Sequence, residues 1–183
     1  MNLPASFEGR ERERLFCALR LPEAALDALC EWQAAQLRDG RAVPRDHLHL
    51  TLAFLGHRPV AELSGIGASL RDAAAAAEPI RLLPERYRET RSVGMLVLKD
   101  LAGTAARLAE DLFGRLERLG VYEREQRPWL PHVTVLRFRG RPRLRPPLPD
   151  LGEVVPSDAA VFLSRLRPSG AEYFVVESFA LGG

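Results

Sequence analysis

Two stretches of the chain share a pattern that limits how the protein can fold. Each has a histidine, an apolar residue, a threonine and a second apolar residue, within a run of strand-forming residues: His49 and Thr51 in the first, His132 and Thr134 in the second. Successive side chains of a strand point to opposite faces. Each histidine therefore shares a face with its threonine, while the apolar residues point to the core. If the two strands meet, two imidazoles and two hydroxyls line one cleft.

Hydrophobic periodicity predicts strands and helices along the rest of the chain. We expect helices between Pro22 and Gly40, over 60–77 and over 101–119, and strands over 14–21, 47–56, 80–87, 92–98, 131–138, 159–166 and 173–181. Residues 122–129 are polar and residues 139–156 are rich in proline and arginine, so both predict surface loops. Pro168-Ser169-Gly170 predicts the turn of a final hairpin.

A weak internal repeat organises these elements. A strand, a helix and a His/Thr strand follow one another from Leu15 to His49, and again from Val93 to His132. We expect one domain over residues 1–183, with two lobes of about 14–90 and 91–183 around a pseudo-twofold axis. Whether strands are exchanged between the lobes is left open. This arrangement sets His49 facing His132.

Composition restricts the class of protein. No apolar run approaches the roughly 20 residues of a membrane helix, and residues 1–14 have no apolar signal core, so we expect a cytoplasmic protein without a membrane partner. The net charge of +2 is too small to indicate nucleic acid by itself. The spacing of Cys17 and Cys30 is not that of a zinc or redox pair, so we expect both to be buried thiols. We expect no cofactor and a monomer.

The two His/Thr pairs are open to four interpretations. One copy alone is typical of a half-buried strand, but two copies at matching places in a repeat make a purely structural role less attractive. Two histidines can bind a transition metal, although stable sites usually add a third protein ligand, and we expect no metal here. The pairs could hold a phosphate without turnover. They could also supply paired acid–base catalysis on a phosphate ester, since histidine titrates near neutrality and threonine hydroxyls can donate to phosphate oxygens.

With its flanking residues, the doubled motif resembles that of the 2H phosphoesterases, and among them the RNA 2′,3′-cyclic phosphodiesterases, also called 2′-5′ RNA ligases. The resemblance covers almost the whole chain and lies in RLFCAL at 14–19, LPE at 21–23, LHLTLAFLG at 48–56, RPWLPHVT at 127–134, SRL at 164–166 and GAEY at 170–173. It implies an α+β bilobal fold in which two antiparallel sheets line a central cleft, with helices outside.

The resemblance also implies a reaction and a set of site residues. An RNA-terminal 2′,3′-cyclic phosphate is hydrolysed to a 2′-phosphate without a metal, and 2′-5′ ligation is the reverse direction. His49 corresponds to the acid and His132 to the base, although pseudo-symmetry lets the two exchange roles. Arg137 corresponds to a phosphate-binding arginine, and Phe54 to a ring that stacks on the terminal base. The alternatives are a small cyclic nucleotide or ADP-ribose cyclic phosphate as substrate, or the binding of a nucleotide or RNA without turnover.

Other residues near the motifs have simpler explanations. Phe54 has the opposite strand parity to His49, so it packs in the core unless a bulge turns it to the cleft. His47 is expected to face solvent. Trp129 and Tyr173 are expected in the core or the cleft wall. Arginines 141, 143 and 145 alternate with proline or leucine, and either follow an RNA backbone or lie on a solvated loop.

Overall fold

The fold is built on one strongly curved antiparallel sheet. The computed structural model describes residues 11–167 and 170–182. Its strands are β1 (Arg12–Arg20), β2 (Arg41–Ala42), β3 (His49–Pro59), β4 (Leu82–Glu89), β5 (Val93–Asp100), β6 (His132–Arg137), β7 (Asp158–Arg167) and β8 (Gly170–Ala180). They follow the order β4-β5-β6-β3-β1-β7-β8, with the short β2 paired to β6. The α+β class expected from the sequence is confirmed.

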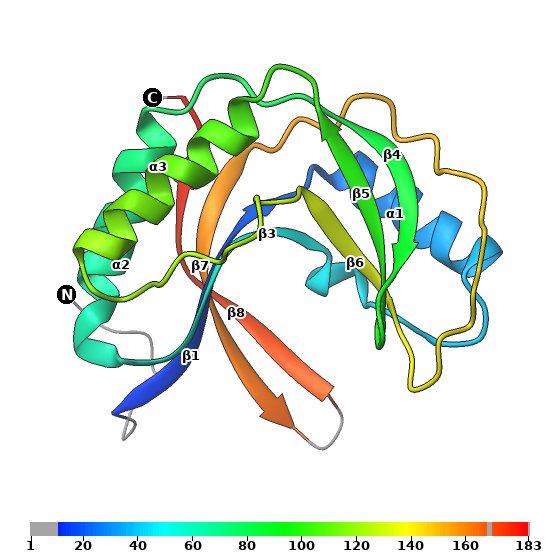
Figure 1. The fold of residues 1–183 in the computed structure, drawn as a ribbon, viewed down its shortest axis with the longest axis horizontal. Helices are drawn as coiled ribbons and strands as arrows, with labels where there is room; N and C mark the ends of the chain where they lie inside the picture. Colours follow the sequence, from blue (N-terminus) through cyan, green and yellow to red (C-terminus); the bar gives the residue numbers. More distant parts are fainter. Residues whose placement is uncertain (1–10, 168–169, 183) are drawn as a thin grey trace.

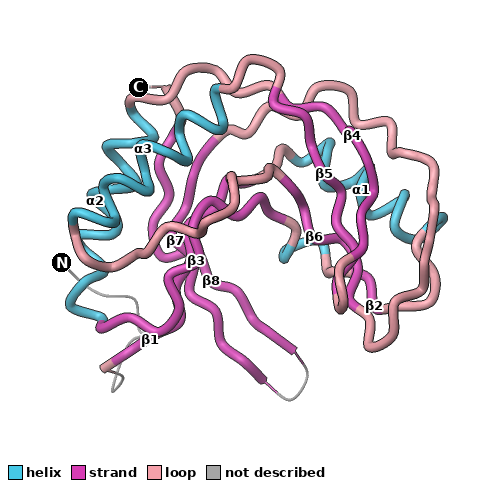
Figure 2. Tube along the Cα trace, in the orientation of Figure 1, coloured by secondary structure: helices cyan, strands magenta, loops and turns pink. Residues whose placement is uncertain are grey.

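A single residue pair joins the two halves of this sheet. Leu50 of β3 pairs with Val133 of β6, and this is the one pair of that ladder, whereas β1 and β3 pair along nine residues of β1. Figures 1 and 2 show β4, β5 and β6 on one side of the molecule and β1, β7 and β8 on the other. The two sheets expected from the sequence are therefore continuous through one short joint between β3 and β6.

The halves of the sheet do not correspond to the halves of the chain. β7 and β8, which come last in the sequence, extend the half that contains β1. β4, which comes from the first half of the chain, pairs with β5. Each half of the sheet thus contains strands from both halves of the chain.

In the described part of the chain, three α-helices cover the outside of the sheet. They are α1 (Glu23–Gln36), α2 (Leu63–Ala75) and α3 (Thr104–Arg118). α2 and α3 pack on one another and α2 contacts β7 and β8, while α1 contacts β6 (Figure 1). In α3 the leucines at 108, 112 and 116 are buried, as an apolar stripe at helical spacing predicts. Among the described residues no helix is long and apolar enough to cross a membrane.

The two faces of β1 show how the chain separates its core from its cleft. Leu15, Cys17 and Leu19 are fully buried in the main core beneath the helices. Phe16 and Ala18 point the other way and form a second, smaller cluster with Ala160, Phe162 and Tyr173. The strand is therefore apolar on both faces, because its second face forms the floor of the cleft.

Several boundaries differ from those expected. The first His/Thr strand begins at His49, because residues Arg45–His47 form a short 3₁₀ turn, and it continues past Gly56 to Pro59. This continuation follows from pairing with residues 12–15 of β1, which the local sequence does not show. The strand β2 was not expected at all. Cys17 is buried, whereas Cys30 is only half-buried. Of the final turn, residues 168–169 lie outside the described part of the chain, as does most of the N-terminal segment.

Candidate active site

The Leu50–Val133 pair places the two His/Thr motifs side by side. Because β3 and β6 are antiparallel, the neighbours of this pair set His49 opposite Thr134 and Thr51 opposite His132. Leu50 and Val133 are buried, so the four polar side chains lie on the other face of the sheet. Each imidazole thus faces a hydroxyl from the other strand, as well as sharing its own strand with one.

Both imidazoles are held in the same way. Nδ1 of His49 lies 2.8 Å from the carbonyl oxygen of His47, and Nδ1 of His132 lies 2.8 Å from the carbonyl oxygen of Leu130. A carbonyl oxygen only accepts hydrogen bonds, so Nδ1 carries the hydrogen in both rings. When a ring is neutral, its Nε2 is then an unprotonated base; when the ring is charged, Nε2 is an acid. The same bond to the second preceding residue is repeated in both motifs.

The surroundings of His49 favour its neutral form. Its ring lies against three aromatic rings, with centroids 4.8 Å from Phe16, 5.8 Å from Phe162 and 5.5 Å from Tyr173. Burial lowers the pKa of His49 from 6.5 to about 4, and the nearby positive charges of His47, His132 and Arg137 act in the same direction. The bond to the His47 carbonyl opposes this shift only in part. In the free protein His49 is therefore neutral at pH 7.

Two adjoining hollows receive these side chains. The first, of about 390 Å³, is lined by His49, Thr51, Thr134, Arg137 and Phe54. The second, of about 1050 Å³, is lined by His132, and again by Thr51 and Phe54. The two shared residues show that the hollows adjoin one another, and we call the two together the cleft. All six residues predicted from the sequence thus line this cleft.

A bulge in β3 brings Phe54 to the cleft. Thr51 pairs with Ala18 and Ala53 with Cys17, so Leu52 has no partner of its own on β1. Leu52 and Ala53 are consecutive and both buried, and this extra position reverses the faces of the residues that follow as far as Leu55, where a second register shift restores them. Phe54 is consequently 48% exposed and lies on the same side as Thr51. Core packing, which simple alternation predicts for this ring, is wrong.

Two further arginines line the cleft that were not expected there. Arg14 of β1 places its guanidinium carbon 4.7 Å from the centroid of the Phe54 ring, and Arg41 of β2 joins Arg137 at the wall of the first hollow. β2 is paired with β6, where Arg41 is opposite Arg137. Arg14 has the same strand parity as Phe16 and could have been found by alternation, but the pairing of β2 carries no local signal. Three guanidinium groups thus surround the first hollow, which makes it suited to an anion.

The aromatic residues near the motifs support the cleft wall. The indole N–H of Trp129 donates to the carbonyl oxygen of Thr51 at 3.0 Å. Tyr173 lies against His47 and His49, with 4.4 Å between the ring centroids of Tyr173 and His47. His47 is therefore part of the wall of the first hollow, and its expected solvent-facing position is wrong. Within the described residues no group of three or more histidines, cysteines or carboxylates is placed to bind a metal ion.

Comparisons with known proteins agree on one family. Residues 19–86 match the family model described as LigT like Phosphoesterase. Over 184 residues the chain is 36% identical to the RNA 2′,3′-cyclic phosphodiesterase of Thermus thermophilus, covering 93% of this chain and 91% of that protein. It is 32% identical over 146 residues to the RNA 2′,3′-cyclic phosphodiesterase of Escherichia coli, covering 69% and 73% respectively. A crystal structure of a Thermus thermophilus protein superposes with a TM-score of 0.80 at 34% identity, covering 93% and 98% of the two chains.

Proposed function

The chain belongs to the LigT-like phosphoesterase family, and we propose that its cleft hydrolyses the 2′,3′-cyclic phosphate at the end of an RNA to a 2′-phosphate. The names of the two relatives support this choice of reaction and of substrate. The observation that carries the proposal within this chain is the matched pair of imidazoles, each with Nδ1 bound to a carbonyl and Nε2 available for proton transfer.

The reaction needs two proton transfers, and the two imidazoles supply both. Water attacks the phosphorus, a new P–O bond forms, and the P–O3′ bond breaks. Nε2 of His132 accepts the proton from the water, and Nε2 of His49 gives a proton to O3′. The phosphate stays on O2′, and one water molecule is consumed. Because the side chains carry out both transfers, the proposed step needs no metal ion.

The remaining cleft residues bind and stabilise the reacting group. Thr51 and Thr134 donate hydrogen bonds to the non-bridging oxygens, where negative charge grows in the transition state. Arg137 holds the phosphate anion, and Phe54 stacks on the terminal base. The guanidinium of Arg14 lies over the Phe54 ring and keeps that ring at the cleft.

The assignment of His49 as the acid requires that this imidazole be protonated when the substrate is bound. The pKa of about 4 leaves this imidazole neutral in the free protein at pH 7. A bound phosphodiester anion favours the charged form of a neighbouring imidazole and raises its pKa. We propose that His49 takes up its proton together with the substrate. The opposite assignment, with His49 as the base, predicts no such proton uptake.

The test is hydrolysis of a short RNA ending in a 2′,3′-cyclic phosphate, in the presence of EDTA. Wild type should release only the 2′-phosphate, while His49→Ala and His132→Ala should lose nearly all turnover. His57→Ala is the matched control, because His57 is exposed on the same strand and lines neither hollow. Loss of activity in EDTA, or a 3′-phosphate product, overturns the proposal. Tight binding of the RNA with no turnover by wild type identifies a binding protein instead.

A further inference from the structure

A third hollow adjoins the cleft on the side of His132. The second hollow, which contains His132, is also lined by Arg86 and Arg88 of β4. Arg88 in turn lines a third hollow of about 500 Å³, together with arginines 141, 143 and 145. Neighbouring hollows thus share lining residues: Thr51 and Phe54 line the first and the second, and Arg88 lines the second and the third. We call the arginines at 88, 141, 143 and 145 the basic track.

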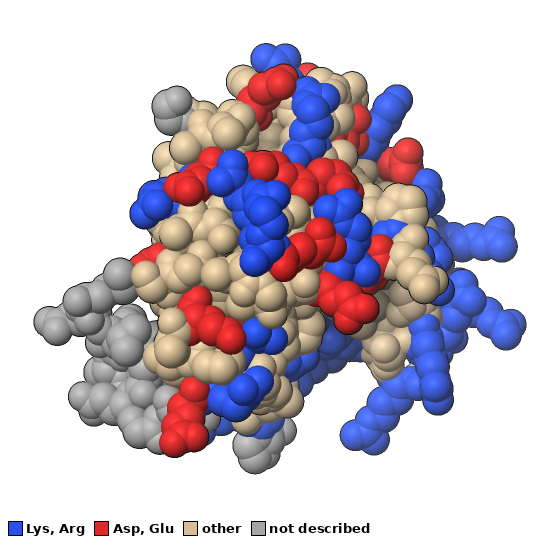
Figure 3. Space-filling model, turned by 60° about the vertical axis from the view of Figure 1, so that its left-hand side comes forward, with Lys and Arg blue, Asp and Glu red and all other residues tan. Residues whose placement is uncertain are grey.

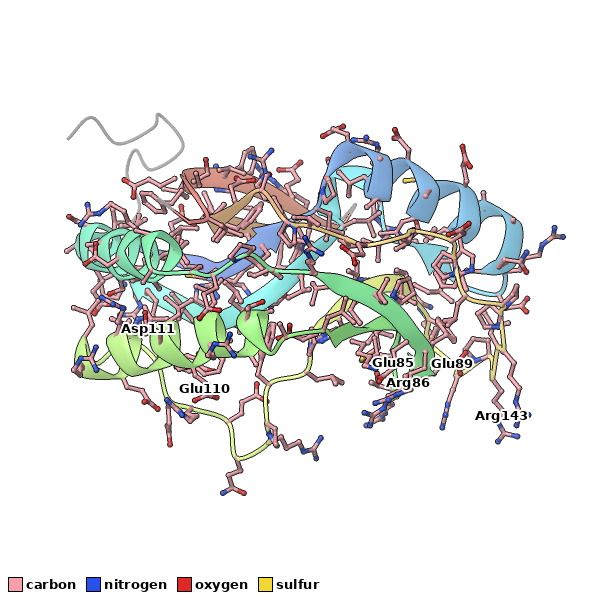
Figure 4. All side chains as sticks on the ribbon, turned by 90° about the horizontal axis from the view of Figure 1, so that it is seen from above. Glu85, Arg86, Glu89, Glu110, Asp111 and Arg143 are labelled. Atoms are coloured by element: carbon pink, nitrogen blue, oxygen red, sulfur yellow. The ribbon has the colours of Figure 1, made fainter. Side chains whose placement is uncertain are left out.

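Most of the basic track has no negative partner. Among the described residues, Arg88, Arg143 and Arg145 form no ion pair with a carboxylate, and Arg141 pairs only with Glu89. Figure 4 shows Arg143 extending from the loop after β6, on the same side of the molecule as Arg86 of β4, which pairs with Glu85. Unpaired guanidinium groups placed on one side of a protein favour binding of a polyanion.

A buried carboxylate fixes the loop that carries the track. Glu89 has a side chain only 2% exposed, and it accepts hydrogen bonds from the backbone N–H groups of Arg143 at 2.9 Å and Leu144 at 2.8 Å. It also accepts from Nε of Arg141 at 3.3 Å. Prolines at 142, 146 and 147 further stiffen the segment. The loop 139–156, although irregular as expected, is therefore anchored to β4, and its arginines are held at the third hollow.

The arginines of the opposite side of the protein are arranged differently. On α2 and α3, three arginines pair with carboxylates: Arg71 with Asp72, Arg107 with Glu78 and Arg115 with Asp111. Figure 3 shows blue and red side chains intermixed in the centre of that face, while blue side chains project from the right-hand edge with little red among them. Most arginines of the helical face are thus neutralised by carboxylates, whereas most of those in the basic track are not.

We propose that the basic track binds the backbone phosphates of the RNA strand behind its reacting end. This inference rests on the proposed function, and it specifies an oligonucleotide rather than a mononucleotide as the substrate class. The reacting phosphate lies between the imidazoles, and a single strand leaving the cleft past His132 meets Arg88 and then the loop arginines. An extended RNA strand carries phosphates at regular intervals, and a stiff loop with arginines at alternate positions carries positive charges at regular intervals as well. The two can therefore bind one another through several phosphate contacts. Hydrolysis of the terminal cyclic phosphate itself requires none of these contacts.

The experiment compares two substrates and two double variants. Arg143→Glu with Arg145→Glu changes the track, and Arg71→Glu with Arg118→Glu makes the same change of charge on α2 and α3. On an RNA of about ten nucleotides with a 2′,3′-cyclic phosphate, the track variant should raise KM by about tenfold or more. The slope of log KM against log salt should fall by about 1.4, which corresponds to two lost phosphate contacts on a single strand. Hydrolysis of 2′,3′-cyclic AMP, and both reactions of the control variant, should be unchanged.

The outcomes separate the track from the proposed function. If wild type cleaves both substrates and the track variant has the KM of the control on RNA, the track is overturned while the proposed function stands. If the variant loses 2′,3′-cyclic AMP hydrolysis equally, the effect is structural and the track is also overturned. If wild type cleaves neither substrate, the proposed function fails. Fluorescence anisotropy of the labelled RNA then decides the track alone, with weaker binding expected only for the track variant, and equal binding by both variants rejecting it.

Discussion

Leu50 and Val133 form the one residue pair between β3 and β6, and their pairing sets the arrangement of the catalytic candidates. Their side chains are buried, while the residues on either side of them turn His49 and Thr51, and His132 and Thr134, to the cleft. Each imidazole is next to a hydroxyl from the other strand as a result. The two motifs are related by the symmetry of the antiparallel pair itself.

This arrangement predicts that the two threonines contribute to turnover more than to binding. Thr51→Val and Thr134→Val keep the shape of the side chain but remove the hydroxyl that stabilises the growing charge. We expect each to lower kcat about 10²- to 10³-fold with little change in KM. Thr51→Ser and Thr134→Ser retain the hydroxyl and should retain most of the activity. A valine variant that raised KM at unchanged kcat would place that hydroxyl in ground-state binding instead.

The burial of His49 predicts a dependence of stability on pH. The pKa of this residue is about 4 in the folded protein and 6.5 when it is unperturbed. Between these values the unfolded chain binds more protons than the folded protein, so the free energy of unfolding falls as the pH falls. At pH 5 the loss relative to pH 7.5 is about 2 kcal/mol from this residue. The free energy of unfolding should be measured in urea at a series of pH values for wild type and for His49→Asn, and the variant should lack this part of the loss. If the free energies of the two proteins depended on pH in the same way, the lowered pKa of His49 would be contradicted.

The same burial predicts an alkaline limb in the rate profile. As the acid, His49 reacts in its protonated form, and kcat/KM reports the pKa of that group in the free protein. That pKa is about 4, so kcat/KM should fall as the pH rises above about 4. Tyr173→Ala opens the aromatic wall around His49 to water and should move this fall toward pH 6.5. Phe174→Ala removes the neighbouring ring, which lines neither hollow, and should leave the limb in place.

The exposed ring of Phe54 predicts a role in binding the terminal base. Phe54→Ala should raise KM for 2′,3′-cyclic AMP about 5- to 150-fold, which corresponds to about 1–3 kcal/mol of lost stacking, with a smaller effect on kcat. Phe54→Tyr keeps an aromatic face and should behave like wild type. An unchanged KM in Phe54→Ala would show that the ring only fills the cleft beside Arg14.

The sequence predicts the motif strands and the faces of their side chains, because alternation is a local property of a strand. It does not predict the bulge at Leu52, since an extra residue is defined only by the pairing with β1. For the same reason Phe54 had two possible positions before the structure decided between them. Arg14 could be placed by parity, whereas Arg41 reaches the cleft through the pairing of β2 with β6. The bulge at Leu52, the position of Phe54 and the position of Arg41 all result from contacts between segments that are distant in the sequence, and local patterns do not show such contacts.

The exchange of strands between the two halves of the sheet has a consequence for how the protein unfolds. A break in the backbone between β4 and β5 gives one fragment with β1 to β4 and another with β5 to β8. Neither fragment contains a complete half of the sheet, so each leaves strand edges and apolar surface that only the other can cover. The fragments should therefore assemble with one another rather than fold separately. We therefore expect the chain to unfold as a single cooperative unit despite its internal repeat.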